Sequence, residues 1–290
     1  MTRAPDIVVV GSLHLDILVE AEALPRLDET ARGSAWRMVC GGKGGNQACQ
    51  AARHGAQTAM VSQVGDDDFG RRLLANLEHH GVDRSAVAVD AGCGSGMSVA
   101  IQDRHGDYGA VIVSGANLTL TTGAVTQALS CAGRFKLLLL QNEIPEAVNV
   151  AAAQAARSNG ARVIVNAAPA RALPPALTAL TDILVVNRVE AEMMAGNRVT
   201  SVQEAQQALP VLLQLASTVV VTLGGDGVVV AARGQDPVVI AAVAVAVKST
   251  HGAGDCFVGA LSASLAKGDG LVEAARLANA AAARHVAGAA

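Results

Sequence analysis

A run of small residues that ends in an acid is the part of the sequence best suited to chemistry. It reads Gly252-Ala253-Gly254-Asp255 and leads into an apolar helical pattern. Residues with little side chain let a ligand approach the backbone, and the free N–H groups of a helix N-terminus attract anions. Asp255 is suited to take a proton from a hydroxyl that attacks a phosphate. An ordinary N-cap aspartate after a glycine turn is the alternative, and this run alone does not decide between the two.

A second glycine-rich segment, Gly41-Gly42-Lys43-Gly44-Gly45-Asn46, leads into another helical pattern that starts at Gln47. It is not a P-loop, because a glycine and not Ser or Thr follows Lys43, and it contains no GxGxxG. Glycines still allow a ligand close to the backbone, and Lys43 and Asn46 offer donors to hydroxyl groups. We therefore expect this segment to contact a ligand that carries hydroxyls.

Polar residues follow several predicted strands. Asp16 comes shortly after the β-branched strand 7–10, and Glu143 follows the strand 137–140. Because ligands bind beyond the carboxyl ends of parallel strands, we expect Asp16 to hold ligand hydroxyls. A solvated loop aspartate is the alternative. His14 lies in the same predicted loop, where a lone histidine is more often structural than catalytic.

Two later segments also have both a functional and a structural interpretation. Asn187 and Glu190 follow the strand 183–186 and lie one helical turn apart, so they suit either the water shell of Mg²⁺ or a capping box. The residues alone favour the capping box. The segment from Thr222 to Gly227 suits a tight hairpin or a backbone cradle for phosphate.

The order of the elements predicts an α/β fold. Apolar runs alternate with helical patterns, which is typical of a doubly wound, mainly parallel sheet flanked by helices. The predicted strands are 7–10, 59–64, 137–140, 162–165, 183–186, 219–222, 228–232 and 238–247, and the predicted helices are 71–80, 124–131, 145–159, 189–195, 201–215 and 271–285.

Two segments do not follow this alternation. The stretch 17–40 is polar, and 96–114 contains two alternating strands joined by a hairpin signal around Gly106. We predict that both are inserted in a single domain, residues 1–290, and form a small β-sheet lid over the site.

The composition excludes several classes of protein. With 51% hydrophobic and 16% charged residues among 290, the chain is globular. A net charge of −3 and 2% aromatic residues argue against a nucleic-acid partner. The longest apolar run, 238–247, is about half a membrane span, so no membrane association is expected. The five scattered cysteines and the lack of a signal-peptide core predict a reduced, cytoplasmic protein without a disulfide or zinc.

The motifs, taken together and in order, resemble those of the ribokinase-like (PfkB-type) carbohydrate kinases over nearly the whole chain. Within that family they are most similar to ribokinases, because Glu143 and the stretch 166–170, Asn-Ala-Ala-Pro-Ala, match positions typical of them. The matching motifs are Gly11-Ser-x-x-x-Asp16, Gly41–Asn46, Asn187-x-x-Glu190, Thr222-x-Gly224-x-x-Gly227 and Gly252–Asp255.

The resemblance implies the ribokinase-like fold and a phosphotransferase that moves the γ-phosphoryl group of ATP to the primary hydroxyl of ribose or a similar sugar. Asp255 would be the base, and the amides of Gly252, Ala253, Gly254 and Asp255 would form the anion hole. Positioning and lid closure would supply the rest of the catalysis. The sugar would be held by His14, Asp16, Gly42, Lys43, Asn46, Glu143 and Asp255.

The resemblance also implies a nucleotide site, a metal and a partner. Asn187, Thr222, Gly224, Gly227 and Asn279 would contact the nucleotide. Glu190 would act on Mg²⁺ through water. The lid strands would pair two subunits, so a homodimer is expected.

Two departures from the family pattern widen the choice of substrate and cofactor. His14 stands where ribokinases usually have an Asn that contacts the sugar, which admits a nucleoside or pseudouridine kinase. Ser249 stands where the family usually has an Asp at a monovalent-cation site, which leaves activation by K⁺ open. A sugar-binding or regulatory protein without catalysis is the alternative of a different class, and the intact Asp255 argues against it.

Overall fold

The architecture comes from a computed structural model that describes residues 4–105 and 107–288. Within these residues nine strands form one sheet, in the order β13-β12-β11-β10-β9-β8-β1-β4-β5. All neighbours are parallel except β12, which runs antiparallel to β11 and β13. The predicted doubly wound, mainly parallel sheet is therefore confirmed. The strands are β1 (Ile7–Val10), β4 (Thr58–Gly65), β5 (Asp83–Asp90), β8 (Leu137–Leu140), β9 (Arg162–Asn166), β10 (Ile183–Asn187), β11 (Thr218–Thr222), β12 (Val228–Ala232) and β13 (Val238–Ile240).

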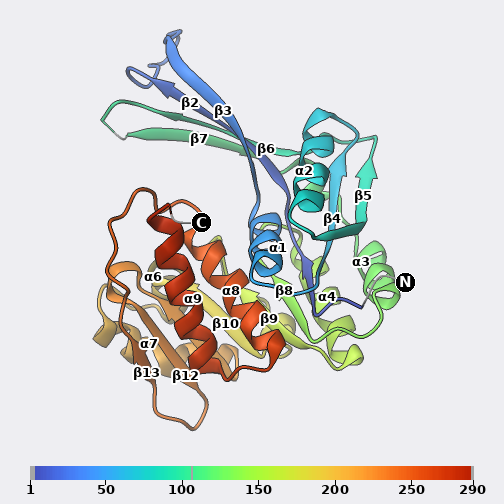
Figure 1. The fold of residues 1–290 in the computed structure, drawn as a ribbon, viewed down its shortest axis with the longest axis vertical. Coiled ribbons are helices and arrows are strands. Elements are labelled where there is room, and N and C mark those ends of the chain that lie inside the picture. Colours follow the sequence, from blue (N-terminus) through green and yellow to red (C-terminus); the bar gives the residue numbers. More distant parts are fainter. Residues whose placement is uncertain (1–3, 106, 289–290) are drawn as a thin grey trace.

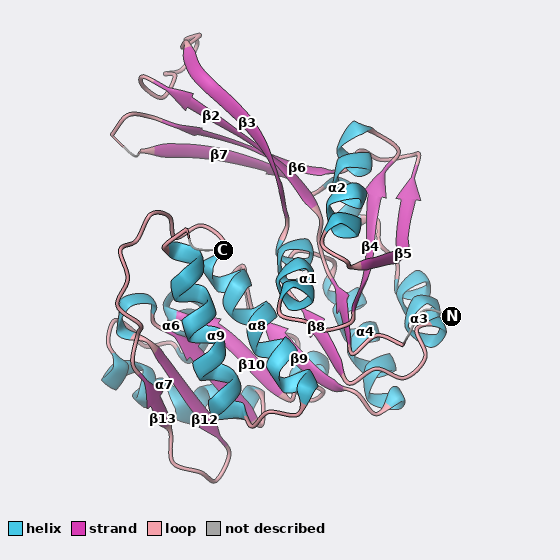
Figure 2. Cartoon of the chain, viewed as in Figure 1, coloured by secondary structure: helices cyan, strands magenta, loops and turns pink. Residues whose placement is uncertain are grey.

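Helices cover both faces of this sheet (Figures 1 and 2). Ile7 and Val9 pack into one core with α1, α2, α8 and α9, whereas Val8 and Val10 pack into another with α3 to α7. Alternate residues of a strand point to opposite faces, so a strand buried on both sides is apolar throughout. The helices are α1 (Lys43–Arg53), α2 (Asp68–His79), α3 (Thr122–Cys131), α4 (Glu146–Asn159), α5 (Pro175–Thr178), α6 (Arg188–Ala195), α7 (Val202–Leu215), α8 (Ala253–Lys267) and α9 (Leu271–Val286).

The strand order reverses direction between β1 and β8. On one side of this boundary the sheet continues from β8 to β9, and on the other from β1 to β4. Ile7 pairs with Leu137 of β8 and with Thr58 of β4. Ligands of open α/β sheets bind at such a switch point, beyond the carboxyl ends of the strands. The residues that follow Val10 and Leu140 therefore lie where a site is expected.

A small second sheet projects from one end of the large one (Figure 1). It consists of β2 (His14–Ala21), β3 (Gly33–Gly41), β6 (Gly96–Gln102) and β7 (Tyr108–Val113), in the order β3-β2-β6-β7. The β2–β3 and β6–β7 pairs are antiparallel, and β2 runs parallel to β6. Because β2 begins at His14, His14 and Asp16 are strand residues at the root of this sheet and not loop residues.

The predicted strand over residues 238–247 is wrong beyond Ile240. β13 pairs with β12 only from Val238 to Ile240, because Ile240 lies opposite Val228, the first residue of β12, and β13 is an edge strand with no second neighbour among the described residues. The alternating Val and Ala residues that follow line a cavity between the sheet and α9. Consecutive residues of this segment line the cavity and most of the segment is exposed, so the alternation of Val and Ala does not correspond to two faces of a strand.

The strand β5 was not predicted, because four of its eight residues, Asp83, Arg84, Ser85 and Asp90, are polar. It pairs with β4 at an edge of the large sheet, and most of its side chains are exposed or half-exposed. An edge strand is partly solvated and lacks the apolar run of a central strand.

The described helices are short on the scale of a lipid bilayer. The last one, α9, has 16 residues, and no helix within the described residues is long and apolar enough to cross a membrane. All five cysteines are free thiols.

Candidate active site

Asp255 lies in the first turn of α8. Gly252 precedes this helix with a φ of 74°, in the left-handed region that glycine adopts without strain. The amide of Ala253 donates to the carbonyl of Thr250 at 3.3 Å, so it is already engaged. The next amides, those of Gly254 and Asp255, belong to the first helical turn and have no acceptor within the helix. They are the ones suited to an anion.

Two side chains of α1 hold the Asp255 carboxylate. Asn46 Nδ2 donates to Oδ2 at 2.9 Å, and Gln47 Nε2 donates to Oδ1 at 2.9 Å. The two helices approach closely at Gly259, where a Cβ would lie 2.5 Å from Gln50 Cβ. The absence of a side chain at Gly259 therefore brings α1 near enough to reach the acid.

The surroundings of Asp255 raise its pKa above the ordinary value of an aspartate. Burial is the main cause, and the charge of Glu143 adds to it. The positive charge of Lys43 and the hydrogen bonds from Asn46 and Gln47 act in the opposite direction. A carboxylate with a raised pKa accepts a proton more readily, which suits a general base.

The helix α1 begins at Lys43, four residues earlier than predicted, so Gly44 and Gly45 are helical. Gly42 supplies the turn, with a φ of 84°. At Gly44 a Cβ would lie 2.6 Å from the backbone nitrogen of Ser12. The glycines thus let the helix N-terminus touch the backbone that follows β1.

Glu143 joins three segments at the switch point. Its Oε2 accepts a hydrogen bond from the Lys43 amide at 2.8 Å and a short one from Ser12 Oγ. Ser12 follows β1, Lys43 opens α1 and Glu143 follows β8, so one carboxylate links all three. Its Oε1 accepts no hydrogen bond from the described residues, 4–105 and 107–288, and so can accept one from a ligand hydroxyl.

His14 and Asp16 lie beside Glu143. His14 is buried; its Nδ1 is 3.9 Å from Glu143 Oε2, and its Nε2 is 3.2 Å from Asn117 Nδ2. Asp16 Oδ1 accepts a hydrogen bond from Ser98 Oγ. A Cβ at Gly41 would lie 2.1 Å from Asp16 Oδ2, so this glycine makes room for the carboxylate.

Asn117 was not identified from the sequence. It lies in the 3₁₀ turn Gly115–Leu118, where its Oδ1 accepts from the Leu13 amide at 2.8 Å and its Nδ2 donates to the carbonyls of Leu13 and Ser114, each at 2.9 Å. Two of these contacts are to backbone atoms of Leu13, which is 104 residues away, and such contacts leave no local signal in the sequence.

Two adjacent cavities meet at the start of α8. One, of about 210 Å³, is bordered by Lys43, Glu190 and Asp255. The other, of about 640 Å³, has a largely apolar wall formed by residues 242–247 and α9. Asn187, Thr222 and Gly254 line both cavities, and Gly224, Gly227 and Asn279 line the larger one.

Asn279 connects α9 to the wall of the larger cavity. It is buried, and its Nδ2 donates to the carbonyl of Ala241 at 2.8 Å. The segment from Thr222 to Gly227 forms a tight turn between the antiparallel strands β11 and β12. The hairpin interpretation of this segment is therefore realised, at the mouth of the same cavity.

Asn187 and Glu190 form the capping box of α6. The Asn187 amide donates to Glu190 Oε2 at 2.8 Å, and the Glu190 amide donates to Asn187 Oδ1 at 3.0 Å. Burial raises the pKa of Glu190, against the hydrogen bonds from Asn187 and the charge of Lys43. The cap also places this carboxylate on the smaller cavity, so the structural and functional interpretations are compatible.

Glu190 is the residue best placed to act on a divalent cation, because it lies on the smaller cavity with Asp255. Within the described residues no group of three or more His, Cys, Asp or Glu side chains is arranged to hold a metal ion. Mg²⁺ usually keeps several waters and binds through one or two carboxylates together with substrate phosphates. One carboxylate on the same cavity as the helix N-terminus of α8, where phosphates could bind, fits that mode of binding.

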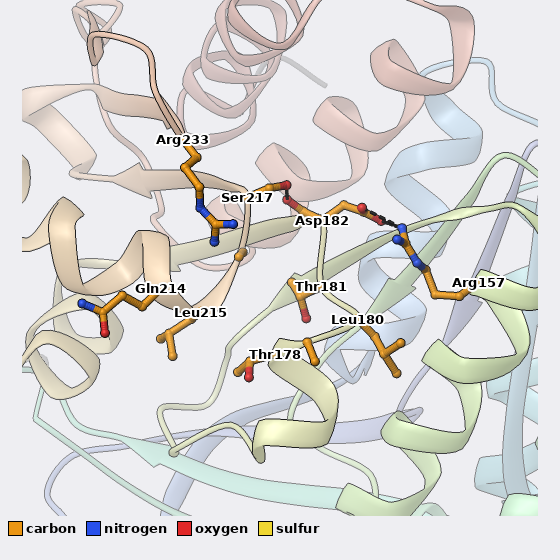
Figure 3. Close-up of a pocket in the computed structure, with 11 residues that line it drawn as sticks. Arg157, Thr178, Leu180, Thr181, Asp182, Gln214, Leu215, Ser217 and Arg233 are labelled. Carbon is orange, nitrogen blue, oxygen red and sulfur yellow. Dashed lines mark hydrogen bonds and ion pairs between the residues drawn. The ribbon is translucent and has the colours of Figure 1, made fainter.

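A third hollow, of about 400 Å³, lies near the amino ends of β10 and β11 (Figure 3). Its charged side chains already have partners: Arg157 pairs with Asp182, and Arg233 donates to the Leu213 carbonyl at 2.8 Å. Arg157 contacts both carboxylate oxygens of Asp182, at 2.8 and 2.9 Å, and Ser217 Oγ donates to the Asp182 carbonyl. We assign no chemistry to this hollow.

Comparisons with known proteins show which proteins the chain is similar to. The sequence profile of the pfkB family of carbohydrate kinases matches residues 4–288. The ribokinase of Mus musculus is 37% identical over 267 residues, which cover 91% of this chain and 83% of that protein. The ribokinase of Haemophilus influenzae is 33% identical over 279 residues, 96% of this chain and 91% of that protein. The structure of Arabidopsis thaliana ribokinase complexed with ribose and ATP superposes with a TM-score of 0.89 at 30% identity, covering 98% of this chain and 93% of that one.

Proposed function

The chain belongs to the pfkB family of carbohydrate kinases and is a sugar kinase, and on this premise we propose that it phosphorylates the primary hydroxyl of ribose or a similar sugar with ATP. The observation that carries the proposal is the position of Asp255, a carboxylate with a raised pKa in the first turn of α8. It faces the smaller cavity. The polar residues around Glu143 lie on one side of it, and the larger, largely apolar cavity lies on the other.

On the sugar side, carboxylates accept hydrogen bonds from hydroxyl groups. Asp16 and the free oxygen of Glu143 are the acceptors, and the donors come from α1. Asp255 takes the proton of the primary hydroxyl, whose oxygen attacks the γ-phosphorus while the bond to the bridging oxygen of ADP breaks. The proposed sugar contacts are His14, Asp16, Gly42, Lys43, Asn46 and Glu143.

On the nucleotide side, the apolar wall of the larger cavity suits an adenine base, and the start of α8 suits the phosphates. The amides of Gly254 and Asp255 would stabilise the transferring phosphoryl group. Thr222, Gly224, Gly227, Asn187 and Asn279 would border the nucleotide. Glu190 would hold Mg²⁺ through water, and the ion would neutralise charge on the phosphates when bound. We place the reaction in the cytoplasm, where free thiols such as these five are stable.

A substrate panel tests the proposal. ADP formation is measured with ribose, other pentoses, hexoses, uridine, adenosine and pseudouridine, each in K⁺ and in Na⁺ salt, because Ser249 offers no charge to a monovalent cation. We expect the highest kcat/KM on ribose or a closely related sugar. A nucleoside that exceeds every sugar would replace this proposal with the nucleoside-kinase alternative, for which the imidazole of His14 is the supporting residue. Bound ATP with no turnover on any compound would favour a binding protein instead.

We further propose that the small sheet is a lid and also the surface through which two subunits pair. Both outer strands of this sheet carry exposed apolar side chains: Trp36 on β3 is 67% exposed, and Val111 and Ile112 on β7 are 68% and 64% exposed. Exposed apolar patches on edge strands mark interaction surfaces.

Analytical ultracentrifugation checks this pairing. We expect twice the 29.2 kDa of one chain, and we expect Val111→Glu to shift the mass to that of a monomer. Val211→Glu makes the same change on the outer surface of α7 and should leave the dimer intact. A native protein that sediments as a monomer at micromolar concentration would contradict the pairing.

A further inference from the structure

A glutamine next to the catalytic acid lies at the centre of a chain of buried amides. We infer that Gln47 is a positioning residue for Asp255, held in one orientation by Gln141 and Asn166. The inference rests on the proposed function, because it takes Asp255 as the base. It names a residue outside the motifs that carry the family resemblance.

Each polar atom of the Gln47 side chain has a partner. Nε2 donates to Asp255 Oδ1 at 2.9 Å and to Asn166 Oδ1 at 2.8 Å, and Oε1 accepts from Gln141 Nε2 at 2.8 Å. The side chain is 0% exposed, so water does not replace any of these bonds. Buried polar groups keep their partners because losing one leaves the other desolvated.

The partners decide which way the Gln47 amide faces. Reversing it would set Oε1 against the carboxylate of Asp255 and Nε2 against the NH₂ group of Gln141. Asn166 is oriented in turn by its Nδ2, which donates to the Val185 carbonyl at 3.1 Å. Orientation of an amide follows from its hydrogen-bond network, and this network presents two N–H groups to two oxygens.

The network connects the acid to the central sheet. Gln141 follows β8 and Asn166 ends β9, so both come from rigid strand ends. The Gln141 carbonyl accepts from Asn149 Nδ2 of α4 at 2.7 Å, on the far side of the sheet. The orientation of Asp255 thus depends on the core of the domain as well as on α8.

Gln141 is a costly residue at this position. Within residues 4–105 and 107–288 its buried Oε1 finds no hydrogen-bond partner, and a Cβ at Gly11 would lie 2.0 Å from it. An apolar side chain would avoid the cost of an unpaired buried acceptor. What the glutamine contributes is the N–H group that orients Gln47.

Two separate donors fix the rotation of the carboxylate. Asn46 holds Oδ2 and Gln47 holds Oδ1, so the lone pairs that remain point in defined directions. Positioning a catalytic group in this way contributes to rate because the reactive geometry no longer has to be found.

The same donors favour the ionised form of Asp255. Lys43 also favours that form, whereas burial and Glu143 oppose it, and Glu190 is the other carboxylate on the same cavity. A base works when ionised, so activity falls as pH decreases through its pKa. Removing the Gln47 donor raises that pKa further, and the fall in activity then begins at a higher pH.

The test compares Gln47→Met with Gln63→Met. Gln63 makes a similar contact elsewhere: its Nε2 donates to Asp90 Oδ2 at 3.0 Å between β4 and β5. For Gln47→Met we expect kcat to fall on the order of 10- to 100-fold and the acid limb of kcat/KM to move to higher pH. For Gln63→Met we expect the native kcat and acid limb, even if the melting temperature decreases.

The activities of Gln47→Met and Asp255→Asn together separate a failure of this inference from a failure of the proposed function. Gln47→Met with native kcat and acid limb overturns the inference, provided that Asp255→Asn has lost activity. An active Asp255→Asn instead overturns the proposed base and leaves Asp255 without this role.

A second variant and a second measurement apply if Gln47→Met does not fold. Gln141→Met keeps the Gln47 donor but not its orientation, so a smaller shift of the acid limb in the same direction is expected. Carbon-13 NMR of labelled aspartates, assigned with Asp255→Asn, reads the pKa of Asp255 without any substrate. An unchanged pKa in Gln141→Met would contradict the inference.

Discussion

Asp255→Asn is expected to lower kcat on the order of 10²- to 10⁴-fold, the usual contribution of one positioned base. The side-chain amide cannot accept the proton of the sugar hydroxyl, whereas the backbone amides at the start of α8, which we propose as the phosphate site, are unchanged. We therefore expect ATP affinity to change little, as measured by calorimetry, while ADP formation is nearly lost. Asp269→Asn is a matched control, because Asp269 accepts from Ser264 Oγ just after the far end of α8.

Asp255→Asn should also change the stability of the fold, because the ionised carboxylate of Asp255 is buried. A carboxyl whose folded pKa is raised above its unfolded value destabilises the fold when it is ionised, that is, at pH above the folded pKa. Replacing Asp255 by a neutral side chain removes that cost. The Asn side chain also sets an NH₂ group against Asn46 or Gln47, a cost that does not depend on pH, so we expect the melting temperature of Asp255→Asn relative to the native protein to increase from acidic pH to pH 8. A clear loss of stability together with native kcat would show that Asp255 is structural.

Glu143→Ala is expected to raise the KM for the sugar on the order of 100-fold. It removes a carboxylate that accepts from Ser12 Oγ and from the Lys43 amide, and with it the proposed acceptor for a sugar hydroxyl. Hydrogen bonds to charged groups are worth about 1.5–3 kcal/mol, and 100-fold corresponds to about 2.8 kcal/mol.

The change at Glu143 should act on binding more than on chemistry. Asp255 keeps its partners on α1, so we expect kcat to fall less than KM rises, in initial-rate measurements at varied sugar concentration. Glu146→Ala removes an exposed carboxylate three residues further on and should leave KM unchanged. An equal KM in the two variants would place the sugar elsewhere.

Much of the fold was predictable because the pattern of apolar residues within each short segment indicates its secondary structure. Val8 and Val10 pack on one face of the sheet and Ile7 and Val9 on the other, so the unbroken apolar run already indicated a central strand. Residues 241–247 show the limit of this reasoning. Their alternation matches a strand, but β12 begins opposite Ile240 and leaves them no partner, and pairing is not a local property.

The site was predictable as a set of motifs but not as a set of contacts. Gly252–Asp255 and Asn187–Glu190 are short segments whose chemistry depends on neighbouring residues, and both appear in the structure as helix starts. The contacts of Asn117 and Gln47 were not predicted. Gln47 was assigned to a helix, and nothing in its neighbourhood indicates a partner 208 residues away.

The amino-acid sequence was enough to establish which chemical groups the chain carries, the periodicity of its strands and its likeness to a kinase family. These are properties of residue types and their order, and they can be read from the sequence without knowledge of the fold. The tertiary structure alone decided that Ser12 meets Glu143 across 131 residues and that Asp255 lies where burial raises its pKa. Burial and long-range contact depend on how β1, β8, α1 and α8 pack together, because removal of water from a charged group is a property of its surroundings and not of its place in the chain.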